Sequence, residues 1–311
     1  MSSSHSDGDL GFAQAFDEPV PYMARTRQWY LALGYDNPYQ WAHYNEVPFA
    51  PLAKPLSEAV VGLITTAALF DPAHGDQGPG SAYNARAKFY EVYSGDSAMD
   101  HDTRISHVAI DRQHTSLEDA GTWFPLPLLR EAAQAGVIGQ VAPRFHGAPT
   151  NRSQRHTLNV DCPALLSRCQ ADGLDAVLLV ANCPVCHQTL SLVARHLEAN
   201  GIATVLMGCA KDVVEYCGVP RFLFSDFPLG NAAGKPHDLA SQRNTLRLAL
   251  KLLQMAPAAR TTIQSPERWS DDPSWKLDYA NPDRVAPEVL VALRREADQA
   301  KLEIARKKGR G

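Results

Sequence analysis

The sequence has few cysteines, no long apolar run and no excess of positive charge. Six cysteines in 311 residues are too sparse for the disulfide framework of a secreted scaffold. No apolar run approaches the ~20 residues that span a bilayer, and the start, MSSSHSDGDLGF, lacks the basic and apolar regions of a signal peptide. With 30 Lys and Arg against 34 Asp and Glu, the net charge of −4 disfavours nucleic acid or anionic lipid as a partner. We therefore expect a cytoplasmic protein that binds neither nucleic acid nor a membrane.

Common nucleotide-binding and hydrolase motifs are absent as well. The chain contains neither G-x-G-x-x-G nor a Walker A sequence, so nucleotide binding has no support, and it contains no G-x-S-x-G elbow. What it does contain is an ordinary globular composition, with 45% hydrophobic and 21% charged residues. This composition and length predict one large folded domain or two modest ones.

Three regions follow one another along the chain. Residues 1–55 form an aromatic, proline-rich arm with one short helix near residues 23–33, and we expect the arm to pack on the core or on a partner. Residues 56–260 form the predicted α/β catalytic core, in which the polar segment 71–104 is long enough to be a lid. Residues 261–311 are predicted to be an irregular segment followed by a charged C-terminal helix. The aromatic arm also makes a homo-oligomer the expected assembly.

Apolar runs and amphipathic segments alternate through the core. The clearest unit consists of the apolar run LDAVLLVAN, the amphipathic run CHQTLSLVARHLEANG and the apolar run IATVLMG, which predict strand, helix and strand. Further strands are predicted at residues 59–70, 105–111 and 221–226, and further helices at residues 125–139 and 238–255. Because this alternation is typical of parallel sheets, we predict an α/β fold: a mostly parallel sheet with helices on both faces, in Rossmann-like layers.

The predicted strand LDAVLLVAN runs directly into Cys183-Pro184-Val185-Cys186-His187. Open α/β sheets bind ligands at the carboxyl ends of their strands, so this turn is the first candidate site. The positive end of the following helix favours thiolates, and Cys183 is expected to be the more activated thiol because it precedes the first helical turn. We therefore predict that Cys183 attacks an electrophile, that Cys186 resolves the adduct and that His187 transfers protons.

A metal site and plain core cysteines are alternative interpretations of this pair. A structural zinc site needs two more ligands, and the spacing of the nearest cysteines, Cys209 and Cys217, fits zinc poorly. A catalytic metal at Cys183, Cys186 or His187 with a distant histidine stays open, and no metal ligand is assigned. Core cysteines would be expected inside the strand or on the apolar face of the helix. The redox or nucleophilic interpretation therefore fits best.

Other predicted strand ends supply candidate substrate-binding residues. Thr65 and Thr66 close the first strand and would hold a carboxylate or an oxyanion, with a helix N-cap as the alternative. Near the second strand, Arg112 suits a bidentate grip on a carboxylate, or a surface ion pair. A loop with two glycines after residue 226 lets the backbone approach a ligand, or forms a plain turn. The candidates are Thr65, Thr66, His107, Asp111, Arg112, Phe227, Gly230 and Asn231.

Longer stretches around these motifs resemble a known family. They are similar to the B-type subunits of the glycine, betaine, sarcosine and D-proline reductases, particularly the D-proline type, which are selenoproteins or their cysteine homologues. The runs that carry the likeness are DAVLLVANCPVCHQTLSLVARHLEANGIATV, VPRFLFSDFPLGNAAGKP, VPYMARTRQWY, PYQWAH, VVGLITTA and WFPLPLLREAAQAGVIGQVAPRFHG. They follow the same order over most of the chain. The resemblance implies that the redox-active position falls on Cys183.

The resemblance also implies an activity: attack on a carbon that bears nitrogen, reductive cleavage of the carbon–nitrogen bond and reducing equivalents from dithiols. This chain departs from the family in two ways. Cysteine replaces selenocysteine, and the sequence shows no self-cleaving site for a pyruvoyl group, which belongs to a companion subunit in those reductases.

The overall prediction is a cysteine-dependent, reductase-like enzyme. It would cleave a C–N or C–S bond of a small, anionic nitrogen or sulfur metabolite, with a dithiol reductant, a thiol reductant protein or a companion subunit as partner. Beyond the dithiol, no cofactor is firmly implied. One alternative is a desulfurase or desulfhydrase that removes sulfur from a thiocarbonyl heterocycle without net reduction. Another is a non-catalytic or redox-sensing subunit of a larger reductase complex.

Overall fold

The computed structural model describes residues 16–35, 39–75, 88–105, 107, 109–295 and 298. Contacts divide the chain into a larger unit of residues 40–269 and a smaller unit that combines residues 1–39 with 270–311. The larger unit contains all six cysteines and every strand found among the described residues. Within the described ranges, no helix combines the length and the apolar character needed to cross a membrane. The domain limits proposed at residues 55 and 260 stay predictions.

One mixed sheet forms the centre of the larger unit. Its strands are β1 (Val60–Thr65), β3 (Tyr93–Asp96), β5 (Gln140–Val141), β6 (Arg144–Gly147), β7 (Ala176–Val180), β8 (Ala203–Gly208), β9 (Arg221–Phe224) and β10 (Thr261–Gln264). Their order is β10–β9–β8–β7–β1–β6–β3, and β5 also pairs with β1. In the part of the chain described, every pairing in this sheet is parallel except that of β3 with β6. A separate antiparallel pair joins β2 (Ala68–Leu69) and β4 (Thr103–Arg104).

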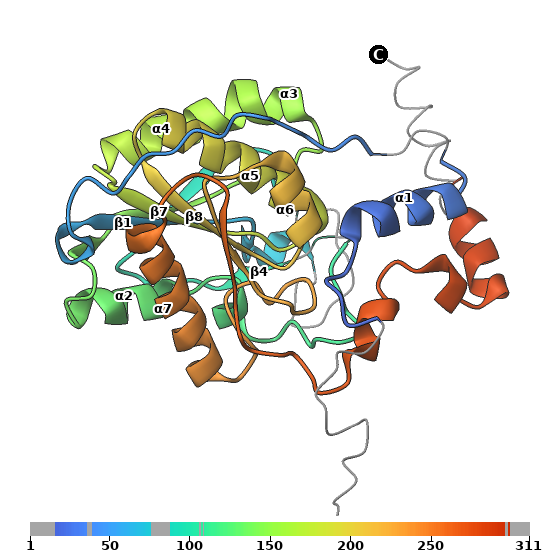
Figure 1. The fold of residues 1–311 in the computed structure, drawn as a ribbon. Coiled ribbons are helices and arrows are strands. Elements are labelled where there is room, and N and C mark those ends of the chain that lie inside the picture. Colours follow the sequence, from blue (N-terminus) through green and yellow to red (C-terminus); the bar gives the residue numbers. More distant parts are fainter. Residues whose placement is uncertain are drawn as a thin grey trace, which may run out of the picture. The chain divides into compact units, whose positions relative to one another are not determined.

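Helices cover both faces of this sheet (Figure 1). On one face lie α3 (Gln154–His156), a π-helical turn (Thr157–Asp161), α4 (Cys162–Ala171), α5 (Pro184–Ala199) and α6 (Lys211–Cys217). On the other face lie α2 (Leu126–Gln134) and α7 (Leu239–Met255). Short 3₁₀ turns occur at Leu56–Glu58, Pro72–His74 and Ala120–Thr122. The predicted α/β fold, a mostly parallel sheet between two helical layers, is confirmed.

The segment from β7 through α5 to β8 places the predicted thiols. All residues of β7 and β8 are buried, as expected for apolar runs in the middle of a parallel sheet. Cys183 is the N-cap of α5 and Pro184 occupies its first turn, where the missing N–H of proline costs nothing. Gly201, with a φ of 84°, follows the C-terminal end of α5 and lets the chain turn into β8. The thiol pair therefore lies where a central buried strand meets its helix.

Two predicted strands differ from the structure. The segment 59–70 divides into β1 and β2, and the described residues of 105–111 form no strand. The side chains of Ile105 and Ile110 instead pack beside Gly230, so their apolar character serves packing and not sheet pairing. Of the predicted lid, residues 76–87 lie outside the described part, and β3 forms a sheet edge.

The sequence prediction did not include β3, β4, β5, β6 and β10, of which β6 and β10 show the reason most clearly. β6 contains one large apolar residue, Phe145, and gains its place by pairing with β1 and β3. β10 lies in a region predicted to be irregular and pairs with β9. Both strands depend on tertiary contacts more than on a local apolar pattern.

The smaller unit contains α1 (Tyr22–Ala32), which matches the helix predicted near residues 23–33. The Tyr22 ring meets the Tyr279 ring edge to face at 5.1 Å between centroids, and Lys276 pairs with Asp17 at 2.7 Å. Residues 287–295 are helical, so the predicted C-terminal helix is present, and its continuation past residue 298 lies outside the described part.

The segment 40–50 belongs to the larger unit. The backbone N–H of Ala42 donates to Gln188 Oε1 (2.7 Å), and that of Ala50 donates to Glu198 Oε2 (2.5 Å). Arg195 donates to the carbonyl oxygen of Glu46 (2.8 Å). This part of the predicted arm is therefore attached to α5.

Candidate active site

The carboxyl ends of β6, β1 and β7 lie side by side. β1 pairs with β6 on one side and with β7 on the other, so the strand order reverses direction at β1. A reversal of this kind opens a crevice outside the strand ends, where open α/β sheets bind their ligands. The segments that leave these strands carry Thr66 after β1, Thr150 after β6 and Cys183 after β7.

Cys183 and Cys186 form a close pair at the carboxyl end of β7. Their sulfur atoms are 2.7 Å apart, and the backbone N–H of Cys186 donates to Cys183 Sγ at 3.2 Å. Cys183 is 4% exposed, whereas Cys186 is completely buried. The predicted Cys-x-x-Cys dithiol is therefore assembled, with Cys183 as its outer member.

Three polar side chains surround the inner sulfur. Thr150 Oγ1 lies 3.7 Å from Cys186 Sγ, and His107 Nε2 lies 3.2 Å from Thr150 Oγ1. His107 and Thr66 both hydrogen-bond to Cys186. The thiols meet side chains from three separate segments, which gives Cys186 an unusual number of donors for a buried sulfur.

The two thiols have opposite pKa shifts. Burial and the neighbouring Cys186 sulfur raise the pKa of Cys183. Burial alone would raise the pKa of Cys186 too, but hydrogen bonds from Cys183, His107 and Thr66 and the charge of His107 hold it well below its usual value. The two directions favour a proton on Cys183 and a thiolate on Cys186 in the resting pair, and the activation of Cys183 expected from helix position stays a prediction. Burial raises the pKa of the other four cysteines, Cys162, Cys169, Cys209 and Cys217.

Two cations act on this dithiol. Lys88, which is half-buried, interacts electrostatically with both thiols and with Arg152, and Arg152 interacts with Cys183. Asn151 Nδ2 donates to the carbonyl oxygen of Tyr90 (3.3 Å), which brings the Lys88 and Arg152 segments together. Arg152 has a φ of 55°, a conformation that costs free energy in a non-glycine residue and is found at functional sites.

His187 has a different place from the one predicted. Its Nε2 accepts the backbone N–H groups of Cys209 (2.8 Å) and Ala210 (3.1 Å), so its Nδ1 carries the proton and donates to the carbonyl oxygen of Cys183 (2.7 Å). Burial lowers its pKa to about 4. Both nitrogens are occupied by backbone groups, so the predicted proton transfer by His187 does not match this geometry. His187 holds the turn, and His107 is the histidine at the thiols.

The remaining residues at the predicted second strand have structural partners. Thr65 Oγ1 donates to the carbonyl oxygen of Trp123 (3.0 Å), and Asp111 accepts from the backbone of Gln113 and His114 (both 3.0 Å). Arg112 donates to the carbonyl oxygen of His107 (2.8 Å), which fixes the segment that carries the imidazole. Arg112 thus positions the segment that carries His107. This contact does not bear on the prediction that Arg112 binds a substrate carboxylate.

The loop after β9 surrounds another cysteine. The backbone N–H groups of Phe227 and Asn231 hydrogen-bond to Cys209, and Asn231 Nδ2 donates to the carbonyl oxygen of Pro228 (2.9 Å). Gly230 has a φ of 108°, and its carbonyl oxygen accepts from Thr122 (3.0 Å). These three predicted residues thus contact Cys209, the loop itself and the neighbouring residues Thr115, Thr122 and Trp269.

Lys88, Thr150, Arg152 and Asn182 were not among the predicted site residues. Asn182 Nδ2 donates to Thr66 Oγ1 (2.9 Å), which orients the hydroxyl beside Cys186. Its position directly before Cys183 was a usable signal. Thr150 and Arg152 follow β6, so finding them required a prediction of that strand.

His107, Cys183 and Cys186 also have the composition of a metal site. One ligand atom from each lies within 4.8 Å of the other two. Two sulfurs and an imidazole suit a soft ion such as Zn²⁺, which would act on a bound substrate as a Lewis acid. The positive charges of Lys88 and Arg152 oppose a cation and favour an anionic ligand. The geometry thus fits a metal in ligand number, while the surrounding charge favours the free dithiol.

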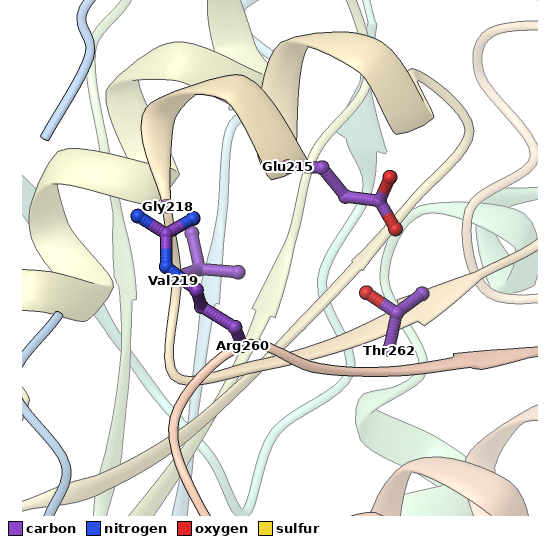
Figure 2. Close-up of a pocket in the computed structure, with 5 residues that line it drawn as sticks. All are labelled: Glu215, Gly218, Val219, Arg260 and Thr262. Atoms are coloured by element: carbon purple, nitrogen blue, oxygen red, sulfur yellow. The ribbon is translucent and has the colours of Figure 1, made fainter. Parts of the chain in front are cut away.

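A cavity lies at the other end of the sheet, beside the amino ends of its strands. Figure 2 shows Glu215, Gly218, Val219, Arg260 and Thr262 around a volume of about 220 Å³. Gly218 and Val219 precede β9 and Arg260 precedes β10, so this cavity is at the amino ends of the strands. Arg260 donates to the carbonyl oxygens of Tyr44 (2.6 Å) and Asn45 (3.1 Å), which commits its guanidinium to the segment 40–50. The cavity is therefore separate from the thiols.

Fold and site together define an α/β protein with a buried dithiol at the switch point of its sheet. The chain is 27% identical over 220 residues to the D-proline reductase subunit gamma of Acetoanaerobium sticklandii, covering 70% of this chain and 88% of the relative. It is 22% identical to the glycine reductase complex component B subunit gamma and to the sarcosine reductase complex component B subunit beta of Peptoclostridium acidaminophilum, over 234 and 240 residues. Each of these two matches covers 74% of this chain and 53% of the relative.

The resemblance noted in the sequence is thus confirmed. The chain spans about half the length of its glycine and sarcosine reductase relatives. No family model matches the chain, and no solved structure matches it significantly. The relatives are subunits of reductases, which supports a reductase-related role.

Proposed function

We propose that this chain is a thiol-dependent, reductase-like enzyme or enzyme subunit that acts on a small anionic nitrogen or sulfur metabolite. The observation that carries this function is the Cys183–Cys186 pair, with its sulfurs 2.7 Å apart at the switch point and donors converging on one of them. The reductase subunits among the relatives support the same class of chemistry.

Cys183 is the attacking thiol because it is the outer member of the pair, 4% exposed against 0% for Cys186. In the resting site Cys186 is the thiolate, and Cys183 keeps its proton and donates it across the 2.7 Å contact. As the Cys183 sulfur approaches an electrophilic carbon, its proton passes to Cys186 and a carbon–sulfur bond forms. His107 donates a proton to the departing nitrogen or sulfur.

The second step regenerates the free product. Cys186 passes its proton to His107, which has just lost its own, and becomes a thiolate again. It then attacks the Cys183 sulfur, so the sulfur–sulfur bond forms and the carbon–sulfur bond breaks. The electron pair of the broken bond stays on carbon, which takes up a proton. The substrate gains two electrons and the dithiol loses two, and an external dithiol then reduces the disulfide. A carboxylate or carbonyl beside the reacting carbon would stabilise the developing negative charge.

Lys88 and Arg152 hold the anionic group of the substrate. Within the described part of the chain neither has an acidic ion-pair partner. Their charges also favour the Cys186 thiolate. They take the role that the sequence had assigned to Arg112.

Alkylation with iodoacetamide across pH, with the labelled sites located by mass spectrometry, tests this function. We expect wild type to be labelled at Cys183 below pH 7 and to lose that labelling after mild oxidation. Cys183→Ser should lose the fast reaction, whereas Cys209→Ser, which changes a buried thiol outside the pair, should keep it. Resistance of both thiols until a chelator is added would establish a metal centre and overturn the thiol mechanism.

Product analysis separates reduction from desulfuration. With dithiothreitol and thiocarbonyl or amino-acid substrates, the reductase step consumes one dithiol per product. Sulfide release without dithiol oxidation would establish the desulfurase instead. Activity only after addition of a second protein would establish a companion subunit. A cytoplasmic location stays a prediction.

A further inference from the structure

The helices α2 and α7 lie on the face of the sheet opposite α5 (Figure 1). Residues of both helices line a groove. Its volume is about 400 Å³. Apolar side chains form most of its lining: Leu128, Ala132, Ala135, Val137, Leu246 and Leu250. Leu128, Leu246 and Leu250 are buried and form its floor, whereas Val137 is 48% exposed. The groove is open to apolar groups that approach from outside.

Three exposed cations follow the α7 side of this groove. Arg243, Arg247 and Lys251 are spaced four residues apart, which places them along one side of the helix. Glu131 on the α2 side pairs with Arg243 at 3.0 Å. Among the residues that the structure describes, Arg247 and Lys251 have no acidic partner. The groove therefore has an apolar floor and a positive edge.

We propose that the α2–α7 groove binds an acidic amphipathic helix of a companion protein. From Arg243 to Gln254 the α7 edge extends about 17 Å, or three helical turns. A helix lying beside it would place carboxylates one turn apart against Arg247 and Lys251 and insert apolar side chains above Ala132 and Ala135. This charge pattern selects an acidic partner and rejects a basic one. The surface is separate from the dithiol, so its function does not depend on the thiol mechanism.

The probe is a fluorescent 18-residue helical peptide with leucines on one face and glutamates along one flank, titrated into the full chain. A peptide with lysine at each glutamate position is the matched control. We expect the acidic peptide to bind, and Arg247→Glu and Lys251→Glu each to weaken binding by about three- to tenfold at low salt. Ala132→Arg should abolish binding by filling the groove. Arg155→Glu, an exposed change on α3, should bind like wild type.

Unfolding midpoints and thiol alkylation rates of these variants should match wild type, which separates the groove from both stability and the active site. Equal binding of the lysine peptide, or wild-type affinity in both charge-reversal variants, would overturn the proposal. Light scattering measures the oligomeric state of wild type and of Ala132→Arg. A dimer that Ala132→Arg dissociates would show that a second copy of this chain occupies the groove, and would also overturn it.

Discussion

The two ends of α5 hold two buried polar clusters that differ in how their charges are paired. At the C-terminal end, Glu198 accepts from Thr204, Arg221 and Ala50, so both carboxylate oxygens have partners. At the N-terminal end, donors converge on Cys186, and two cations stand near the thiols without acidic partners in the described part of the chain. A cluster whose charges cancel holds the fold together. A cluster with unpaired positive charge can bind an anionic ligand.

The direction of the sheet explains this division. Because β7, β8 and β9 are parallel, one end of α5 meets the carboxyl ends of the strands and the other meets their amino ends. Loops at the carboxyl ends carry the site, while Arg221 at the start of β9 and Thr204 near the start of β8 close the opposite edge. The comparison predicts that stability and reactivity respond to changes at opposite ends of one helix.

The largest expected effect is on stability, at the C-terminal end of α5. Glu198→Ala leaves the Arg221 guanidinium buried without its carboxylate, and we expect a loss of about 3–5 kcal/mol in the free energy of unfolding. Urea denaturation measures this, with the exposed Glu215→Ala as a control that should change little. If Glu198→Ala proves too unstable to purify, Glu198→Gln should show a smaller loss. The pH profile of thiol alkylation should match wild type, and a shifted profile would show that the two ends are coupled.

The next largest effect is on reactivity, at the N-terminal end. Cys183→Ser should slow alkylation of the protein at pH 6 by about 100-fold, because Cys186 is completely buried and burial raises the pKa of the other four thiols. The free energy of unfolding should stay within about 1 kcal/mol of wild type. The rate is measured by quenching the alkylation at set times and quantifying the labelled protein by mass spectrometry. Fast labelling of Cys186 in this variant would mean that the inner thiol is accessible and that the assigned order of attack is wrong.

His187 lies at the N-terminal end of α5, but its ring bonds to backbone groups of the turn and therefore affects stability. Burial lowers its pKa from 6.5 to about 4, so below pH 6.5 the unfolded chain binds a proton that the folded chain excludes. The stability that this group contributes is complete above pH 6.5 and falls as the pH drops toward 4. We expect wild type to lose about 2 kcal/mol from this group by pH 5. Urea midpoints at pH 7 and pH 5 should show a smaller loss in His187→Gln, and equal losses would contradict the assignment.

Much of the fold could be predicted from the sequence because its central elements carry strong local patterns. The apolar run before Cys183 becomes β7, and the amphipathic run after it becomes α5. The Cys-x-x-Cys turn was predictable for the same reason, since a buried strand that runs into a helix places it at the carboxyl edge. β6 has no such pattern, and the prediction missed it together with Thr150 and Arg152.

The two histidines show the limit of reasoning from adjacency. His187 lies four residues after Cys183, one helical turn away, so its ring bonds to the Cys183 carbonyl oxygen. The same ring accepts a hydrogen bond from the backbone that follows β8. His107 is far away in sequence, and the fold brings it to Cys186. Adjacency in the helix therefore pointed to His187, whose ring nitrogens bond to backbone groups, whereas the tertiary arrangement places His107 beside Cys186.

The smallest expected effect is a change in alkylation rate in His107→Asn. The direction of this change distinguishes a free dithiol from a metal site. His107→Asn removes a hydrogen bond and a positive charge from Cys186, so the pKa of Cys186 should rise and alkylation of the pair at pH 6 should slow by about tenfold. His114→Asn, which changes the partner of Asp111, is the matched control and should keep the wild-type rate. If a metal held the thiols, the loss of one ligand would release them, and alkylation would become faster instead. A faster reaction in His107→Asn would therefore contradict a free thiolate in the resting site. It would also contradict the proposed difference between the two ends of α5.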